Sequence, residues 1–192
     1  MACLAQQINA IDRQLWIRNE VSEDLLGYFY LKLKEQGLFR WLYFQKPPSL
    51  SQFLSWHKDP NSIYLGCFSC STIEHNNDPL LAGMGWINQI TRLPGLAKAE
   101  VSMAFLREFQ RNGEALELAR MMIEFAFDRV NLDALFGCTP IRNRAAVVFT
   151  QKCGFRKIGV APMYCSWHGE PCDALLTVLT RAQWQADLKG EG

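Results

Sequence analysis

The residues that most directly suggest chemistry form one short loop, Gln110-Arg-Asn-Gly113-Glu-Ala115. It follows a strand-like run and precedes the most amphipathic stretch of the chain, residues 113–130. The first N–H groups of a helix lack partners within the helix, and the helix dipole is positive there, so such a loop can bind a phosphate. Gly113 lets the backbone approach an anion closely, and Ala115 leaves room beside it. The same residues also fit a helix that simply begins at a glycine.

Cysteine and histidine positions argue against a metal site or a nucleophilic triad. Cys67 and Cys70 lie three residues apart in one predicted strand, so their side chains point to opposite faces, although Cys165, His168 and Cys172 offer further ligand types. The three histidines show no partner pattern. Seven irregularly spaced cysteines indicate reduced thiols in a cytoplasmic protein rather than a disulfide framework. We therefore expect no bound metal.

Composition narrows the class of protein further. The 192 residues include 20 basic and 19 acidic ones, a net charge of +1, so no global field favours nucleic acid or an anionic membrane. No apolar run approaches the roughly 18 residues that a membrane span needs. The first basic residue is Arg13, so the beginning of the chain does not read as a signal peptide. We expect one globular domain over residues 1–192, with no repeat or linker.

The first half of the chain predicts two helices and then three strands. Residues 22–36 begin at Ser22, a helix-capping residue, and end before Gly37. A short helix is expected from Ser49 to about His57, after two prolines. Strand-like runs follow at 63–73, 80–90 and 96–106. The short turns between these runs favour an antiparallel meander.

After residue 106 the apolar period changes from two to 3.6, which predicts the helix over 113–130. Polar residues form only a narrow stripe on this helix, so we expect it to pack against a sheet. The elements expected next are a strand at 134–139, a helix at 143–152, and strands at 155–161 and 174–179. This order indicates an α/β fold with a mixed, mostly antiparallel central sheet flanked by helices.

Together with Asn143-Arg-Ala-Ala146 and Cys153-Gly154-Phe155, the loop resembles the GCN5-related N-acetyltransferase (GNAT) family. In that family, Q/R-x-x-G-x-G/A holds the pyrophosphate of acetyl-CoA, and N-x-x-A followed by G-F lies beside the pantetheine arm. The resemblance covers residues 80–160 well, and the first 60 residues match only in the order of their elements. It implies a GNAT-type fold, acetyl-CoA as acyl donor, and an amine acceptor that is either a small molecule or a protein amine.

Carried over by position, the resemblance assigns cofactor contacts to three segments. Backbone amides from 111 to 115 would bind pyrophosphate. The strand end at 105–106 would pair with pantetheine and supply an amide for the oxyanion, and Asn143 would form a hydrogen bond with the pantetheine arm. The residues implied are Phe105, Leu106, Gln110, Arg111, Asn112, Gly113, Glu114, Ala115 and Asn143. Trp86 and the aromatic segment 39–44 are candidates to line the acceptor cleft.

Two residues depart from the family pattern. Glu114 would weaken pyrophosphate binding unless its side chain turns to solvent, and Thr150 replaces the usual tyrosine acid. Expelling a thiolate of pKa near 8.5 at pH 7 costs only about 2 kcal/mol, whereas deprotonating an ammonium of pKa near 10.4 costs about 4.6 kcal/mol. A base is therefore worth more than an acid, and activity can survive Thr150. Tyr164 is a substitute acid or, alternatively, an exposed hairpin tyrosine.

Glu100 is the candidate base. Strand alternation places it on one face with Ser102 and Ala104, and several family members carry a catalytic glutamate near the start of this strand. The alternative is a solvated glutamate paired with Lys98. At the level of the whole protein, the alternative to direct acetyl transfer is a non-catalytic module of the same fold that binds CoA or a protein partner.

Overall fold

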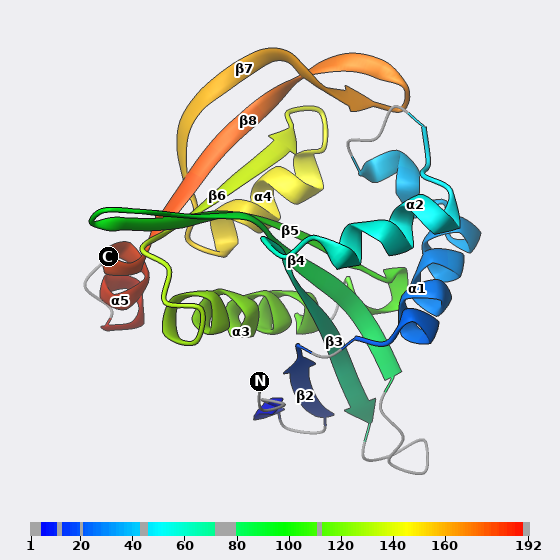
Figure 1. Ribbon diagram of the computed structural model, residues 1–192, viewed down its shortest axis with the longest axis horizontal. Coiled ribbons are helices and arrows are strands. Elements are labelled where there is room, and N and C mark those ends of the chain that lie inside the picture. Colours follow the sequence, from blue (N-terminus) through cyan, green and yellow to red (C-terminus); the bar gives the residue numbers. More distant parts are fainter. Residues whose placement is uncertain are drawn as a thin grey trace.

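An eight-stranded sheet forms the centre of the structure, which is a computed structural model describing residues 5–10, 13–19, 21–42, 46–71, 80–110 and 113–189. The strands lie in the order β1-β2-β3-β4-β5-β6-β8-β7 (Figure 1). Their bounds are β1 Ala5–Ala10, β2 Arg13–Arg18, β3 Ile63–Ser71, β4 Leu80–Leu93, β5 Leu96–Phe105, β6 Ala134–Pro140, β7 Arg156–Trp167 and β8 Glu170–Thr180. Neighbouring strands are antiparallel except β5 and β6, so the expected mixed, mostly antiparallel sheet is confirmed.

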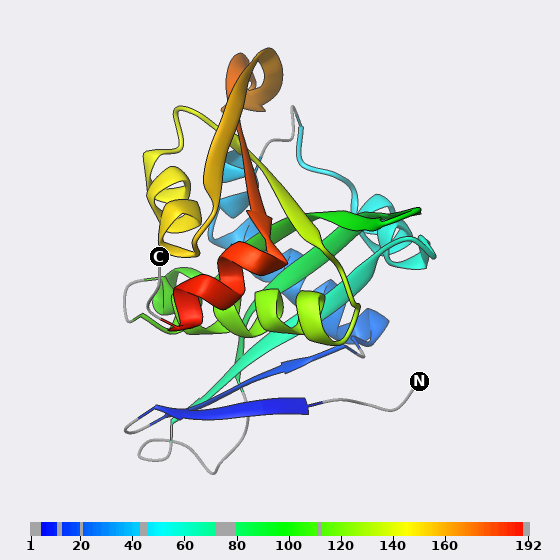
Figure 2. The ribbon, with the colours of Figure 1, turned by 90° about the vertical axis from the view of Figure 1, so that its left-hand side faces the viewer.

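Helices flank this sheet on both faces. Their bounds are α1 Glu23–Glu35, η1 Leu38–Trp41, α2 Leu50–Ser55, η2 Trp56–Lys58, η3 Arg107–Phe109, α3 Glu114–Asp128, α4 Arg144–Lys152 and α5 Arg181–Lys189. Figures 1 and 2 show α1 and α3 on opposite sides of β3 and β4. None of the helices in the described part of the chain is both long and apolar enough to cross a membrane.

Packing contacts identify which face of β4 each helix covers. A Cβ added at Gly85 would lie 1.5 Å from the Met122 Cε of α3, so α3 packs directly on the backbone there. The next residue, Trp86, turns to the other face, where its ring lies 6.3 Å from that of Phe29 in α1. Asn88, two residues along β4 from Trp86, therefore also faces the α1 side. So do Glu100 and Ser102 of β5, which lie directly opposite Asn88 and Trp86.

The parallel pair β5–β6 is short, and this shapes the site. The two strands pair only from Lys98 opposite Ala134 to Glu100 opposite Phe136. Beyond that point β5 continues along β4 as far as Phe105, while β6 continues along β8. The two strands consequently separate after Glu100, as Figure 1 shows.

Local signals explain most of the elements that the sequence predicted. The Ser22 side chain caps α1 by accepting from the Leu25 N–H, and Ser49 forms a capping box with Gln52 at the start of α2. Gly37 follows α1 with φ +62°, a conformation that favours glycine. Residues 72 and 73 of the expected strand 63–73 lie outside the described residues.

Five elements, β1, β2, α5 and the 3₁₀ turns η1 and η3, were not predicted from the sequence, and β7 and β8 are longer than expected. Among residues 15–18 of β2, whose burial the structure describes, Leu15 and Ile17 are the buried ones, so the alternation spans too few residues to be recognised. In α5 the apolar signal reduces to one buried side chain, Trp184. These elements depend on contacts with the rest of the sheet rather than on local pattern.

Candidate active site

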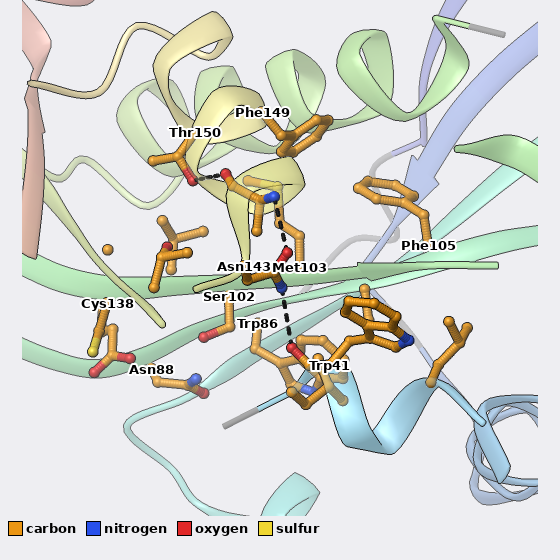
Figure 3. A pocket seen from close by; sticks show the side chains of 18 of the residues that line it. Trp41, Trp86, Asn88, Ser102, Met103, Phe105, Cys138, Asn143, Phe149 and Thr150 are labelled. Atoms are coloured by element: carbon orange, nitrogen blue, oxygen red, sulfur yellow. Dashed lines mark hydrogen bonds between the residues drawn. The ribbon is translucent and has the colours of Figure 1, made fainter. Parts of the chain in front are cut away.

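A cavity of about 1310 Å³ opens where β5 and β6 separate. It exceeds the roughly 300–1,000 Å³ of a typical single-ligand pocket, so there is room for two ligands. Its walls come from β4, β5, β6, α4 and the N-terminal segment that includes η1 and η2. Figure 3 shows that Asn143, Phe149 and Thr150 of the α4 region lie on one side and that Asn88 and Ser102 of the sheet lie on the other.

The edge of β5 along this cavity offers backbone hydrogen-bonding groups. The Leu106 N–H donates to the Ala82 carbonyl at 2.9 Å, so it points toward β4. Because facing directions alternate along a strand, the polar groups of Met103 and Phe105 point the other way, to the side from which β6 has separated. The Phe105 carbonyl there accepts from the Gln110 side chain at 2.7 Å. An extended ligand with amide groups can therefore pair with this edge as a further strand would.

The beginning of α3 has the geometry of an anion site. Gly113 adopts φ +79° and ψ −20°, and a Cβ there would meet nothing within 4 Å, so the backbone conformation alone calls for glycine. The Gly113 carbonyl accepts from the Leu116 and Glu117 N–H groups. The Ala115 N–H lies in the first turn, where N–H groups have no acceptor within the helix, and Ala115 lines the cavity. Arg111 and Asn112 lie outside the described residues.

The Glu114 side chain does not turn to solvent, although we expected that orientation to be needed if the carboxylate was not to weaken pyrophosphate binding. Its side chain is only 6% exposed, and it does not line the cavity. One turn later on the same face of α3 is Leu118, which is fully buried, so this face packs against the interior. The carboxylate is therefore kept out of the cavity by burial rather than by solvation.

Asn143 lines the cavity but already has two hydrogen bonds within the protein. Its Oδ1 accepts from the Ala146 N–H at 3.2 Å, which caps α4, and its Nδ2 donates to the Trp41 carbonyl at 3.3 Å (Figure 3). The residue thus connects α4 to η1 across the cavity. Its predicted contact with the cofactor would replace the longer of these bonds.

Thr150 also lines the cavity, and its hydroxyl is engaged. The Oγ1 donates to the Ala146 carbonyl of the same helix at 2.8 Å (Figure 3). Tyr164, the substitute acid, lies on β7, is 68% exposed and does not line the cavity, as the alternative of an exposed tyrosine requires. Neither side chain therefore has a proton directed at the cavity.

Glu100 lies at the point where β5 and β6 separate. It lines the cavity, is directly opposite Asn88 of β4, and shares a face with Ser102. Burial raises the pKa of its carboxyl. The Lys98 Nζ lies 5.7 Å from the ring centre of Phe136, and within the described ranges no ion pair joins it to Glu100. The geometry therefore favours a base over a solvated ion pair.

A thiol lies beside this carboxylate. Cys138 of β6 lines the cavity, and burial, followed by the charge of Glu100, raises its pKa to about 11. It is consequently protonated at neutral pH, which does not suit a nucleophile. The part of the chain that the structure describes contains no group of three or more His, Cys, Asp or Glu side chains placed to hold a metal ion.

Aromatic side chains line the end of the cavity on the α1 side. Trp41 and Trp86 were expected there and line it, whereas residues 43 and 44 of the expected segment lie outside the described residues. Trp56 and Tyr64 line the cavity as well and were not predicted to do so. Tyr64 is directly opposite Trp86 in the β3–β4 register, and the sequence alone does not determine the register between these two strands.

Comparison with known proteins gives consistent matches. The family model described as the acetyltransferase (GNAT) domain matches residues 14–156. A putative ribosomal N-acetyltransferase, YdaF, from Bacillus subtilis (strain 168) is 23% identical over 166 residues, covering 80% of this chain and 83% of that protein.

Solved structures show the same fold. A spermidine N-acetyltransferase from Vibrio cholerae, in complex with CoA and spermine, superposes with a TM-score of 0.73 at 16% identity, covering 89% of this chain and 98% of that one. A ribosomal-protein-S5-alanine acetyltransferase from Vibrio fischeri gives a TM-score of 0.70 at 18% identity, covering 93% of this chain and 98% of that one.

Proposed function

The chain belongs to the GNAT acetyltransferase family, and on that premise we propose that it transfers the acetyl group of acetyl-CoA to a primary amine by direct attack, with Glu100 as the base. One observation carries the proposal. The separation of β5 and β6 opens a cavity that has the N-terminus of α3 at one end and the Glu100 carboxylate beyond the open edge of β5.

The residues present fit acetyl-CoA. The N–H groups at the start of α3, from Gly113 to Ala115, would hold the pyrophosphate, and the edge of β5 at Phe105 would pair with the amides of pantetheine. When bound, acetyl-CoA supplies the thioester carbonyl that the amine attacks. Each charge-assisted amide–phosphate bond contributes about 1.5–3 kcal/mol.

Glu100 would accept the proton of the acceptor ammonium. Deprotonating an alkylammonium at pH 7 costs about 4.6 kcal/mol, which makes a base the most valuable group in the site. Burial raises the pKa of Glu100, and a carboxylate whose pKa lies closer to neutral pH is a stronger base. Glu100 lies where β5 and β6 separate, next to the open edge of β5 that would hold the acyl group.

The oxyanion would be stabilised by a backbone amide of the open edge. The Leu106 N–H is taken by the Ala82 carbonyl, and the Phe105 N–H would pair with pantetheine. The Met103 N–H, next along the open edge toward Glu100, is therefore the available donor. No side-chain acid is assigned to the leaving thiolate. Thr150 donates to Ala146 instead, and the thiolate costs only about 2 kcal/mol to expel at pH 7.

Mass spectrometry of an amine panel incubated with acetyl-CoA and the protein tests this function. Product detection is preferable to a thiol reagent, because the chain itself carries seven cysteines. We expect acetylated amine that depends on the protein, together with binding of acetyl-CoA by calorimetry. Binding without turnover of any amine would favour the non-catalytic module, and absence of both would contradict the proposal.

A further inference from the structure

Three polar side chains meet on the floor of the cavity, on the α1 side of the sheet. Asn88 is directly opposite Glu100, and Ser102 is two residues further along β5, on the same face. All three line the cavity, and within the described residues none of these side chains makes a hydrogen bond to the protein. Figure 3 shows Asn88 and Ser102 beside Cys138. We call Asn88, Glu100 and Ser102 the ammonium site.

The chemistry of this site matches a primary ammonium. Such a group has three N–H donors and no acceptor. The site offers a carboxylate, an amide oxygen and a hydroxyl, all of which accept hydrogen bonds. Charge-assisted bonds of this kind are about twice as strong as neutral ones. A ligand that brings the donors would therefore satisfy groups that the protein leaves available.

Three aromatic side chains lie next to the ammonium site. Tyr64, directly opposite Trp86, and Trp56 of η2 line the same end of the cavity, and the Tyr64 hydroxyl donates to the Trp56 carbonyl, which fixes η2 against β3. Trp86 is 9% exposed, whereas Trp56 is 37% exposed, so the inner ring is packed and the outer one is accessible. We call Trp56, Tyr64 and Trp86 the aromatic wall.

The charged side chains that line the cavity leave one negative charge without an opposite partner, because three are acidic (Asp59, Glu100 and Glu108) and two are basic (Arg40 and Arg107). Of the acidic residues that line it, Asp59 already accepts from Asn61 and Ser62, and Glu108 accepts from Gln36. Glu100 has no such bond. The two arginines, Arg40 and Arg107, would repel a second positive charge on the ligand.

We infer that the acceptor is a primary monoamine on an aromatic body, with its ammonium in the ammonium site and its ring on the aromatic wall. This inference rests on the proposed function. In the reaction, Glu100 takes one ammonium proton, a C–N bond forms between the amine nitrogen and the acetyl carbon, and the C–S bond breaks. The electron pair leaves with sulfur as thiolate, and a second proton leaves the nitrogen of the product to water.

Competition between 2-phenylethylamine, propylamine, spermidine and a peptide with N-terminal alanine tests the inference. We expect kcat/KM for 2-phenylethylamine to exceed that for each of the other three by about tenfold or more, the effect of burying one ring. A higher value for spermidine, for the peptide or for propylamine would overturn it.

Variants locate the ring. Trp56→Ala should lower kcat/KM for 2-phenylethylamine about fivefold or more and change that for propylamine less than about twofold, while Trp56→Phe retains the preference. Tyr28→Ala removes an aromatic side chain that is 49% exposed on α1 and outside the cavity, and it should change neither value. Equal losses for both amines in Trp56→Ala would contradict the inference.

Ser102→Ala tests the ammonium site. Because it removes one hydrogen bond to the ammonium, it should raise KM for the amine about threefold or more. It should leave the affinity for acetyl-CoA unchanged. Calorimetry with acetyl-CoA separates the two proposals. If acetyl-CoA binds and another amine is preferred, only the choice of acceptor fails. If acetyl-CoA does not bind and no amine is acetylated, the proposed function fails as well.

Discussion

Thr150 stands where the family resemblance places a tyrosine acid, and its surroundings show that the position is tolerant. The residue lines the cavity, and none of the residues of α4, all of which the structure describes, is buried. Its hydroxyl donates a hydrogen bond to the Ala146 carbonyl rather than to a ligand. The cavity therefore has space for a larger side chain at this position.

We predict that Thr150→Tyr folds and leaves kcat equal or higher, because it adds a proton donor worth at most about 10²–10⁴-fold. Thr150→Val is the matched control, since it removes the hydroxyl at constant size, and it should retain the rate. Turnover and melting temperature of both variants check this. Loss of folding in Thr150→Tyr would show that the helix is packed more tightly than its exposure indicates.

At the scale of single residues, chemistry could be assigned from the sequence where it depends on local pattern. Gly113 and Ala115 were identified from the start of a helix, and Glu100 from strand alternation together with the family resemblance. The structure brings Ala115 and Glu100 to one cavity. Their roles toward acetyl-CoA and the acceptor remain predictions. The engagement of Asn143 with Trp41 could not be predicted, because it joins residues 102 positions apart.

The separation of β5 and β6 is the feature at the scale of elements that makes the site. A parallel pair of only three register positions leaves the rest of β5 with an open edge, and α3 is the next α-helix along the chain, after the short turn η3. The Gln110 side chain, at the end of η3, donates to the Phe105 carbonyl and so connects the chain between β5 and α3 to the strand end. Strand and helix together thus form the proposed cofactor site.

We predict that Gly113→Glu abolishes the rise in melting temperature caused by acetyl-CoA. In the unchanged protein, ligand at about 100 times its Kd adds about 2.7 kcal/mol of stability. The substitution places bulk and negative charge at the N–H groups of α3. It also forces a side chain into φ +79°, which costs about 1–2 kcal/mol.

Gly95→Glu is the matched control for that cost. Gly95 has φ +76° and equally open surroundings, but it lies in the turn between β4 and β5. We expect both variants to melt at a lower temperature and only Gly95→Glu to keep the acetyl-CoA shift. A shift that survives in Gly113→Glu would place the cofactor elsewhere.

Elements with strong local signals were predicted and those without were missed. The meander β3–β4–β5 follows from short turns, and α1, α2, α3 and α4 follow from caps and periodicity. The length of the β5–β6 pairing could not be predicted, because it depends on how β4 and β8 hold these two strands in the assembled sheet. Register between strands distant in sequence is a property of the assembled sheet.

At the scale of the whole molecule, the cavity joins residues from distant parts of the chain. Trp41 and Trp56 come from the N-terminal segment, Glu100 from the central sheet and Thr150 from α4. The predicted GNAT-type fold and N-acetyltransferase activity agree with the family to which the chain belongs. The aromatic wall could not be predicted, because isolated tryptophans and tyrosines show no sequence period that distinguishes cavity from core.

The pH dependence of kcat/KM, for the unchanged protein and for Glu100→Gln, tests the central claim most directly. A base acts when it is deprotonated, and burial raises the pKa of Glu100, so kcat/KM should rise with pH through a value above the ordinary glutamate pKa of 4.5. Glu100→Gln should lower kcat/KM about tenfold or more and remove that limb of the profile, while the Kd for acetyl-CoA stays the same. Full activity of Glu100→Gln with an unchanged profile would contradict the account.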